Sequence, residues 1–487
     1  MRHEKLKRQV VSGFAWEGVT KLVIQTVSWG STIIVARILM PSDYGIVAIS
    51  GVFIGLLAII TDMGLSEGLI NTASVTIEDQ DTIFWLSLLL GTLIYGVLFF
   101  LAPYISNIYQ MEMLTEIMRT AAFVLIFSSL KVVPVALAMR NMDFRFRSLV
   151  EMAGQLASVV TVITLAMLGF GAWSLVWAML VSQLVITIAY LHLLKSAPRF
   201  TFKLRETWPI ISFGGKLMTS RIIGFFMLES PVFIIGFFLG QKAAGYYSMA
   251  AILAMMPMDK IGSIFNRITF PALSKIKSNR SQSRALFLDM HHYLLIISYP
   301  ILIGLMLVAD DLILFFLTEK WMSIIPLIKI LCAINLIRVS GMLMPPALEG
   351  TGHVNRVLYF HVMAIIILPI AYVIGVNWGL EGVLYSWMLA YPPLYMYLIF
   401  SVFRVLNINL IEFINTIISP VVASLLMVLV VAAVQYISVD MPIFINLLLT
   451  VLVGALTYLA TYFIFYRDEL ARIRRGLYSL KKGKATV

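Results

Sequence analysis

Charged and polar side chains recur at helical spacing inside an apolar stretch near the start of the chain, residues 16–31 (WEGVTKLVIQTVSWGS). On a helix, Glu17, Lys21, Gln25 and Ser28 fall within an arc of about 80°, and the other faces are apolar. A charge at bilayer depth costs at least about 2.5–3.5 kcal/mol, so this stripe must face protein or water. Two interpretations stay open. The stripe lines a cavity, or it is a helix–helix contact in which Glu17 and Lys21 partly neutralise each other.

A second polar face, again centred on a lysine, lies within the apolar segment 209–238. Lys216 and Ser220 belong to this face. Arg221 and Glu229 point elsewhere on the same helix, so they either pair with other helices or serve the function directly. Two lysines at the centres of two such faces favour a functional role for both.

Further ionisable residues interrupt other apolar segments. Lys260 follows Asp259, Arg338 is near the middle of an apolar segment, and Asp62 is near the end of another. Bases outnumber acids in these segments. The bases are Lys21, Arg119, Lys131, Lys216, Arg221, Lys260, Lys329 and Arg338, and the central acids are Glu17, Asp62, Glu229 and Asp259. Because Lys and Arg bind phosphate groups by charge-assisted hydrogen bonds, this excess of base predicts an anionic ligand. A transporter of cations should show the reverse balance.

Composition identifies the class of protein that carries these charges. The chain has 487 residues, of which 60% are hydrophobic and 13% charged, whereas soluble proteins are about 45–50% apolar and 25% charged. It is therefore predicted to be an all-α polytopic membrane protein. The net charge of +11 lies mainly in alternate loops, which indicates membrane topology rather than a nucleic-acid partner.

The sequence predicts neither a metal site nor a bound cofactor. The one cysteine, Cys332, lies in an apolar run, and the adjacent His291 and His292 have no HxxxH or HExxH spacing. A GxxxxGK[ST] motif does not occur, so ATP is not expected to drive the protein.

Apolar segments near the about 20 residues that cross a bilayer set the topology. Fourteen are predicted, at about 15–38, 45–65, 83–106, 115–137, 149–168, 173–194, 209–238, 244–267, 288–316, 323–345, 356–375, 380–402, 412–436 and 443–466. With both termini in the cytoplasm, the inner loops and termini together hold 25 Lys and Arg, against two or three outside. All outer loops are short. The function is therefore expected among the helices, and no catalytic residue or enzyme activity is predicted.

An internal repeat divides the chain. ILMPSDYGIVAIS, from Ile38, aligns with FLGQKAAGYYSMA, from Phe238, so that Gly45 and Gly245 coincide at an offset of 200. A later match follows in the same order. The repeat predicts two parallel six-helix lobes, 1–205 and 206–405, related by a pseudo-two-fold axis along the membrane normal. The last two helices and a basic tail, 406–487, lie outside it. These two helices either shelter a lipid tail or thicken the lobe.

The segments VARILMPSDYGIVAISGVFIGLLAIITDMGLSEGLI and GFFLGQKAAGYYSMAAILAMMPMDKIGSIFNRITFPALSKI resemble the second-helix and eighth-helix signatures of bacterial polysaccharide flippases. These form the polysaccharide-transport branch of the multidrug/oligosaccharidyl-lipid/polysaccharide exporter superfamily. The chain is most similar to the subgroup that exports colanic acid and related exopolysaccharides. The two repeat halves suggest alternating access around a site at their interface. The resemblance implies a V-shaped pair of lobes with a central hydrophilic cavity, lined largely by the first, second, seventh and eighth helices.

The resemblance also implies the cargo: an undecaprenyl-pyrophosphate-linked oligosaccharide repeat unit, flipped from the cytoplasmic to the periplasmic leaflet of the bacterial inner membrane. Its pyrophosphate would neutralise the buried bases. The candidate cavity residues are Glu17, Lys21, Gln25, Ser28, Asp62, Lys216, Ser220, Arg221, Lys260 and Arg338. The expected partners are this lipid, membrane lipid and other polysaccharide-assembly membrane proteins. The drive is the membrane potential, or exchange with a proton or sodium ion through Glu17 or Asp62. A multidrug cation antiporter and a membrane-embedded polysaccharide polymerase are the alternatives.

Overall fold

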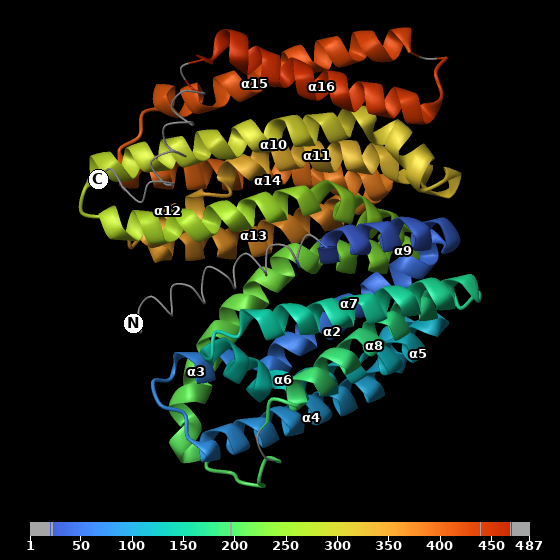
Figure 1. The fold of residues 1–487 in the computed structure, drawn as a ribbon, viewed down its shortest axis with the longest axis vertical. Coiled ribbons are helices and arrows are strands. Elements are labelled where there is room, and N and C mark those ends of the chain that lie inside the picture. Colours follow the sequence, from blue (N-terminus) through green and yellow to red (C-terminus); the bar gives the residue numbers. More distant parts are fainter. Residues whose placement is uncertain (1–19, 21–22, 195–196, 439, 468, 470–487) are drawn as a thin grey trace. The chain divides into compact units, whose positions relative to one another are not determined.

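The computed structural model describes residues 20, 23–194, 197–438, 440–467 and 469, which form helices and turns without a β-strand (Figure 1). The chain divides into two compact units, Met1–Ser248 and Met249–Val487. The first unit ends inside the long helix α9. The predicted lobe boundaries, after residues 205 and 405, stay a prediction.

The first unit contains the helix Val23–Ile38 and the helices up to α9. They are α2 (Pro41–Asp62), α3 (Leu65–Asn71), α4 (Ile77–Tyr109), α5 (Glu112–Ala121), α6 (Phe123–Arg140), α7 (Phe144–Met167), α8 (Ala172–Leu191) and the first part of α9 (Leu204–Ile276). The backbone of α9 breaks at Gly240, where φ is 85° and ψ is 178°. This break falls where the sequence predicts a loop between two apolar segments.

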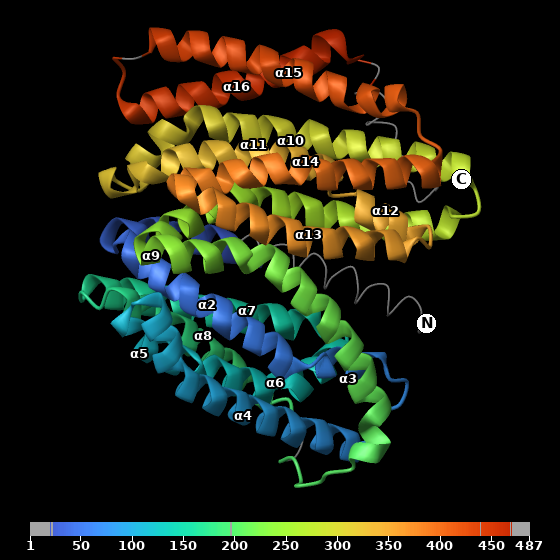
Figure 2. The ribbon, with the colours of Figure 1, turned by 180° about the vertical axis from the view of Figure 1, so that it is seen from behind.

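The second unit contains the rest of α9 and the helices that follow it. They are α10 (Arg280–Phe316), η1 (Glu319–Ile324), α11 (Ile325–Gly341), α12 (Met344–Gly350), α13 (Val354–Gly375), η2 (Val376–Trp378), α14 (Gly379–Leu406), α15 (Leu410–Ile437) and α16 (Ile443–Phe465). Helices α15 and α16 lie beside α10 in both views (Figure 2). Buried Ala423, Met427 and Tyr458 pack there against Ile296 and Ile303 of α10. These two helices therefore thicken the second unit.

Eleven helical stretches in the described part of the chain are long and apolar enough to cross a membrane, and Val23–Ile38 is a shorter apolar helix. Two of the eleven are long enough for two crossings, since α9 has 73 residues and Val354–Leu406 has 53, and one crossing requires about 20. The prediction of an all-α polytopic membrane protein is confirmed. The count of fourteen helices stays a prediction.

A tight turn joins α2 to α3 and brings this region against α9. Met63 and Gly64 both have left-handed backbones, with φ of 48° and 64°. A Cβ atom on Gly64 would lie 2.8 Å from the Cα atom of Gly214 on α9, and one on Gly214 would lie 2.5 Å from the carbonyl oxygen of Met63. Only two glycines permit backbones to approach this closely. The contact fixes the part of α9 that follows Gly214 beside the end of α2.

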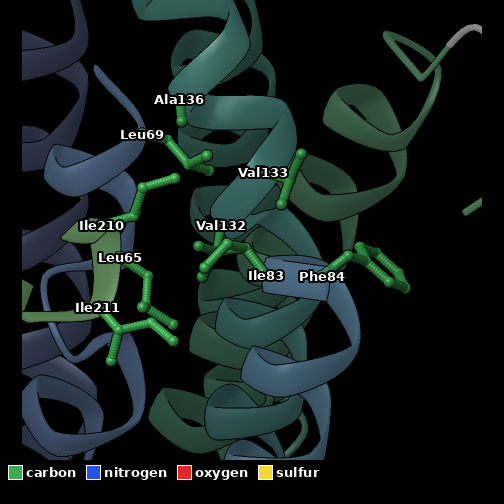
Figure 3. Close-up of a cluster of buried hydrophobic side chains, with 9 residues drawn as sticks. All are labelled: Leu65, Leu69, Ile83, Phe84, Val132, Val133, Ala136, Ile210 and Ile211. Atoms are coloured by element: carbon green, nitrogen blue, oxygen red, sulfur yellow. The ribbon is translucent and has the colours of Figure 1, made fainter. Parts of the chain in front are cut away.

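A buried apolar cluster holds the start of α9 in place (Figure 3). Ile210 and Ile211 of α9 pack among side chains of α3, α4 and α6. The other members of the cluster are Leu65, Leu69, Ile83, Phe84, Val132, Val133 and Ala136. Burial of such aliphatic side chains stabilises the contact by about 1.5–3 kcal/mol each. This packing therefore fixes the position of the segment of α9 that precedes Lys216 and Ser220.

The two repeat segments meet at their equivalent glycines. A Cβ atom on Gly45 would lie 1.7 Å from the carbonyl oxygen of Gln241, and one on Gly245 would lie 1.8 Å from the carbonyl oxygen of Pro41. Pro41 and Gln241 are themselves 200 residues apart, so the contact is reciprocal. A local two-fold relation between the segments would produce this pattern, and it agrees with the repeat in the sequence.

We expect Gly245→Ala to destabilise the protein by about 1–3 kcal/mol. The new Cβ atom would overlap the carbonyl oxygen of Pro41, and a backbone atom cannot move aside as the end of a flexible side chain can. Thermal unfolding of the purified protein in detergent measures this. Gly224→Ala is the matched control, since Gly224 lies on the same helix with open space around its Cα atom. Equal unfolding temperatures for the two variants would contradict the contact.

Candidate functional site

The structure places the predicted residues of the first helix only in part. Glu17 and Lys21 lie outside the described residues. Gln25 is half-buried on Val23–Ile38. Ser28 lines a cavity of about 320 Å³ within the first unit, whose polar walls also include Gln155 of α7 and Gln183 of α8. Ser28 is therefore positioned inside the helix bundle.

Arg221 of α9 forms ion pairs with two carboxylates. Its Nη1 atom lies 3.0 Å from Oδ2 of Asp62, and its Nη2 atom lies 2.5 Å from Oε1 of Glu67. Asp62 ends α2 and Glu67 is in the first turn of α3. Ser66 donates a hydrogen bond of 3.4 Å to the second oxygen of Asp62. The sequence left two interpretations of Arg221, pairing with other helices or a direct functional role. In the structure Arg221 pairs with carboxylates of α2 and α3.

Lys216 and Ser220 follow Gly214, the glycine of α9 that contacts Gly64, by two and six residues, and both are exposed. Within the described part of the chain, Lys216 makes neither a hydrogen bond nor an ion pair. Its ammonium group therefore keeps its three hydrogen-bond donors available for a ligand. It differs in this respect from Arg221, which carries the same charge five residues along the helix.

The second unit holds another group of charged residues. Arg338 of α11 donates a 3.0 Å hydrogen bond to Oδ1 of Asn335, and its guanidinium carbon lies 5.3 Å from the ring centre of Trp387. Asp259 of α9 lies within electrostatic reach of both Arg338 and Lys260. Lys260 itself is exposed and makes no ion pair among the described residues. Two bases and one acid give this group a net positive charge.

Other intramembrane bases have local partners. Lys131 donates to the side-chain oxygen of Gln183. Arg119 donates to the carbonyl oxygen of Phe99 at 3.0 Å and lies over the ring of the same residue. Lys329 pairs with Asp310 at 2.6 Å. Among the described candidate cavity residues, Lys216, Lys260 and Arg338 are thus the bases that make no ion pair, and Arg338 contacts Asn335 and Trp387 instead.

Glu67 is the residue of this site that sequence reasoning missed, because the sequence predicts an inner loop there. Asp62 and Glu67 are five residues apart, and on a continuous helix they would be well separated around the axis. The left-handed turn at Met63 and Gly64 brings them to one side instead. The Gly64 in the sequence was the available signal, since glycine readily adopts positive φ.

Comparison with known proteins supplies the family and the fold. Residues 34–326, more than half of the chain, match a family model described as polysaccharide biosynthesis protein. Over 479 residues the chain is 25% identical to an uncharacterized membrane protein in the cps region of Klebsiella pneumoniae, covering 97% of this chain and 98% of that one. It is also 25% identical to lipopolysaccharide biosynthesis protein WzxC of Escherichia coli (strain K12), over 76% of each. Identity to succinoglycan biosynthesis transport protein ExoT of Rhizobium meliloti (strain 1021) is 26%, over 71% of this chain and 70% of that one.

Solved structures share the fold. The lipid II flippase MurJ in an inward closed conformation matches with a TM-score of 0.72 over 93% of this chain and 99% of its own, at 16% identity. An inward-facing multidrug transporter of the MATE family matches with a TM-score of 0.60 over 79% of this chain and 96% of its own, also at 16% identity. The architecture is thus one that is known from both a lipid flippase and a drug transporter.

Proposed function

The chain belongs to the family of polysaccharide biosynthesis proteins, and from this premise we propose that it is a flippase for a lipid-linked oligosaccharide. In this proposal it moves an undecaprenyl-pyrophosphate-linked repeat unit from the cytoplasmic to the periplasmic leaflet of the bacterial inner membrane. Movement occurs by alternating access between two six-helix lobes, 1–205 and 206–405. The protein acts as a transporter and not as an enzyme.

The observation that carries this proposal is the pair of exposed lysines, Lys216 and Lys260, on α9. Each lies in an apolar helical stretch long enough to cross a membrane and makes no ion pair among the described residues. An uncompensated cation in such a helix is costly unless water or an anion accompanies it. A pyrophosphate headgroup supplies that anion, with charge-assisted hydrogen bonds to each ammonium group.

The names of related proteins support the proposal that this chain is a lipid flippase. One relative is named as a transport protein for succinoglycan biosynthesis, and a structural neighbour is named as a lipid II flippase. We place both termini in the cytoplasm, because 25 basic residues then lie in the inner loops and termini. An anion that moves outward gains about 2.3 kcal/mol per charge per 100 mV of membrane potential, and exchange with a proton or sodium ion is a second drive.

The test is leaflet-to-leaflet transfer of a fluorescent undecaprenyl-pyrophosphate-linked oligosaccharide in proteoliposomes. We expect the purified protein to equilibrate this lipid between the leaflets, and liposomes without protein not to do so. Efflux of cationic dyes without lipid transfer would instead identify a multidrug antiporter. Formation of polymer by the purified protein would identify a polymerase.

A further inference from the structure

A cavity of about 720 Å³ in the first unit has no part in the site described above. It lies where the turn between α4 and α5 meets the break in α9, and its walls are the two short segments 108–113 and 237–241. We call it the α4–α9 cavity. Its volume falls within the range of small-molecule sites, about 300–1,000 Å³.

Two interruptions of regular helix form the walls of the α4–α9 cavity. Gln110 caps α4 with a left-handed backbone, at a φ of 54°, and α5 begins at Glu112. The buried hydroxyl of Ser106 donates a 2.6 Å hydrogen bond to the carbonyl oxygen of Met111, which holds this turn. On the opposite wall, α9 breaks at Gly240. Both walls therefore have a defined backbone conformation.

Aromatic rings form the apolar part of the cavity. Phe237 and Phe238 are 42% and 50% exposed, and their ring centres lie 4.7 Å apart in an edge-to-face arrangement. The ring of the buried Tyr109 contacts that of Phe237 at 5.7 Å, and its hydroxyl donates to the carbonyl oxygen of Phe233 at 3.3 Å. Tyr109 therefore supports Phe237, while both phenylalanine rings keep exposed surface.

Polar side chains line the same cavity, and they are Gln110, Glu112 and Gln241. None of these three side chains makes a hydrogen bond or an ion pair with the described residues. The two carboxamides each supply donors and an acceptor, and the carboxylate accepts from more than one hydroxyl group. The cavity thus places available hydrogen-bonding groups beside exposed aromatic rings.

The charges in the walls exclude several classes of ligand. The described residues that line the cavity include neither Lys nor Arg, and the carboxylate of Glu112 repels anions, so a pyrophosphate does not belong here. No group of three His, Cys, Asp or Glu side chains suited to a metal ion occurs in the described part of the chain. An acyl chain would bury the polar side chains without partners.

A neutral sugar is complementary to both kinds of wall. Its hydroxyl groups can donate to and accept from the carboxamides of Gln110 and Gln241, and can donate to the carboxylate of Glu112. Its C–H groups carry partial positive charge, and they pack favourably against the negative face of an aromatic ring. The exposed rings of Phe237 and Phe238 supply such faces.

The predicted topology places the α4–α9 cavity on the periplasmic side. With both termini in the cytoplasm, the predicted segments 83–106 and 209–238 each run outward, and each ends next to one wall of the cavity. Lys216 precedes Phe238 by 22 residues on α9, which is about 33 Å along a helix at 1.5 Å per residue. The cavity is therefore distinct from the proposed pyrophosphate site.

We propose that the α4–α9 cavity is a binding site for a neutral sugar of the repeat unit on the periplasmic side. The sugar packs against Phe237 and Phe238, and its hydroxyl groups bond to Gln110, Glu112 and Gln241. The assignment of this sugar to the transported lipid rests on the proposed function. Binding of the sugar itself is measured without transport.

The test uses the full-length protein in lipid nanodiscs. The probe is the uncharged oligosaccharide of the fluorescent lipid used in the transfer assay, released from its pyrophosphate by mild acid. Saturation-transfer NMR detects its binding and gives the dissociation constant. We expect the wild-type protein to bind this oligosaccharide. Inorganic pyrophosphate should not displace it, because the described residues of the cavity include no base.

Two variants alter the two kinds of wall separately. Phe238→Ala removes an exposed ring, and Gln241→Ala removes one carboxamide, and each should weaken binding about 3- to 10-fold. Phe270→Ala is the matched control and should bind as the wild type does, because Phe270 is a 44% exposed phenylalanine of α9 outside the cavity. Gel filtration checks that each variant is folded, and Gln241→Ala is decisive if Phe238→Ala is not.

The outcomes separate failure of the sugar site from failure of the proposed function. Absence of binding to the wild type, unchanged binding in Gln241→Ala and folded Phe238→Ala, or displacement by pyrophosphate would overturn the sugar site. If the wild type nevertheless transfers the fluorescent lipid, the proposed function stands. If both variants bind the oligosaccharide more weakly but the wild type transfers no lipid, the sugar site stands and the flippase function is wrong.

Discussion

Replacing Lys216 with alanine is expected to lower the rate of lipid-linked oligosaccharide transfer about 10- to 100-fold without loss of folded protein. The side chain is exposed on α9 and makes no hydrogen bond or ion pair in the described part of the chain, so its removal breaks no such polar contact there. A hydrogen bond to a charged group contributes about 1.5–3 kcal/mol, which corresponds to this range of rates if the bond forms only with bound cargo. Transfer in proteoliposomes measures the effect.

Two further variants make the Lys216 result specific. Lys216→Arg keeps the charge and should retain most of the activity, although the planar guanidinium presents its donors differently. Lys242→Ala removes the same charge from a lysine of α9 that lies 5.8 Å from the ring centre of Tyr246, two residues after the break at Gly240, and should transfer lipid normally. Wild-type transfer by Lys216→Ala would remove Lys216 from the site.

The positions of the membrane helices could be predicted well because the bilayer itself imposes them. The sequence predicts helices at 412–436 and 443–466, and the structure has α15 at Leu410–Ile437 and α16 at Ile443–Phe465. Helix α16 contains no charged residue, so its ends follow from apolar length. Helix α15 contains only Glu412, which caps its first turn by accepting a 3.1 Å hydrogen bond from the backbone amide of Asn409. Helix α2 begins earlier than predicted, because Pro41 takes the first helical position and Asp43 accepts from the backbone amide of Met40 at 2.8 Å.

The sequence alone could not predict which charged side chains form ion pairs, because this depends on the rotation of each helix about its axis and on where the helices cross. The sequence shows Arg221 and Asp62 as separate intramembrane charges, 159 positions apart. Their pairing requires the close approach of Gly64 and Gly214, which depends on two glycines in distant segments. His291 is a similar case, because its neighbours Ser340, Tyr395 and Thr416 come from three other helices.

The bases that the sequence groups together therefore separate into two physical classes. Arg221, Lys131 and Lys329 each have a side-chain partner within the protein, whereas Lys216 and Lys260 have none in the described part. A buried base with a partner contributes to structure, and a base without one needs a ligand or water. Substitution of a base that has a partner should consequently reduce the amount of folded protein, whereas substitution of a base without a partner should reduce transport.

Arg221→Met is expected to reduce the amount of folded protein sharply, in contrast to Lys216→Ala. The substitution leaves Asp62 and Glu67 as two neighbouring carboxylates without their shared cation. Loss of one partner of a fully buried ion pair costs about 3–5 kcal/mol, and we expect about 1–3 kcal/mol here because these side chains are 28–44% exposed. The unfolding temperature of the purified protein and the monodisperse fraction on gel filtration measure the loss.

A compensated variant tests whether unpaired charge is the cause. Arg221→Met combined with Asp62→Asn and Glu67→Gln removes both carboxylates, and we expect it to recover most of the unfolding temperature, since a neutral site of similar volume has no charge to compensate. Arg267→Met, which removes an exposed arginine of the same helix that makes no ion pair among the described residues, should leave stability unchanged. If Arg221→Met alone is as stable as the wild type, the triad does not hold α9 against α2 and α3. If the triple variant is folded but transfers no lipid, Arg221 contributes to the cargo site as well as to the fold.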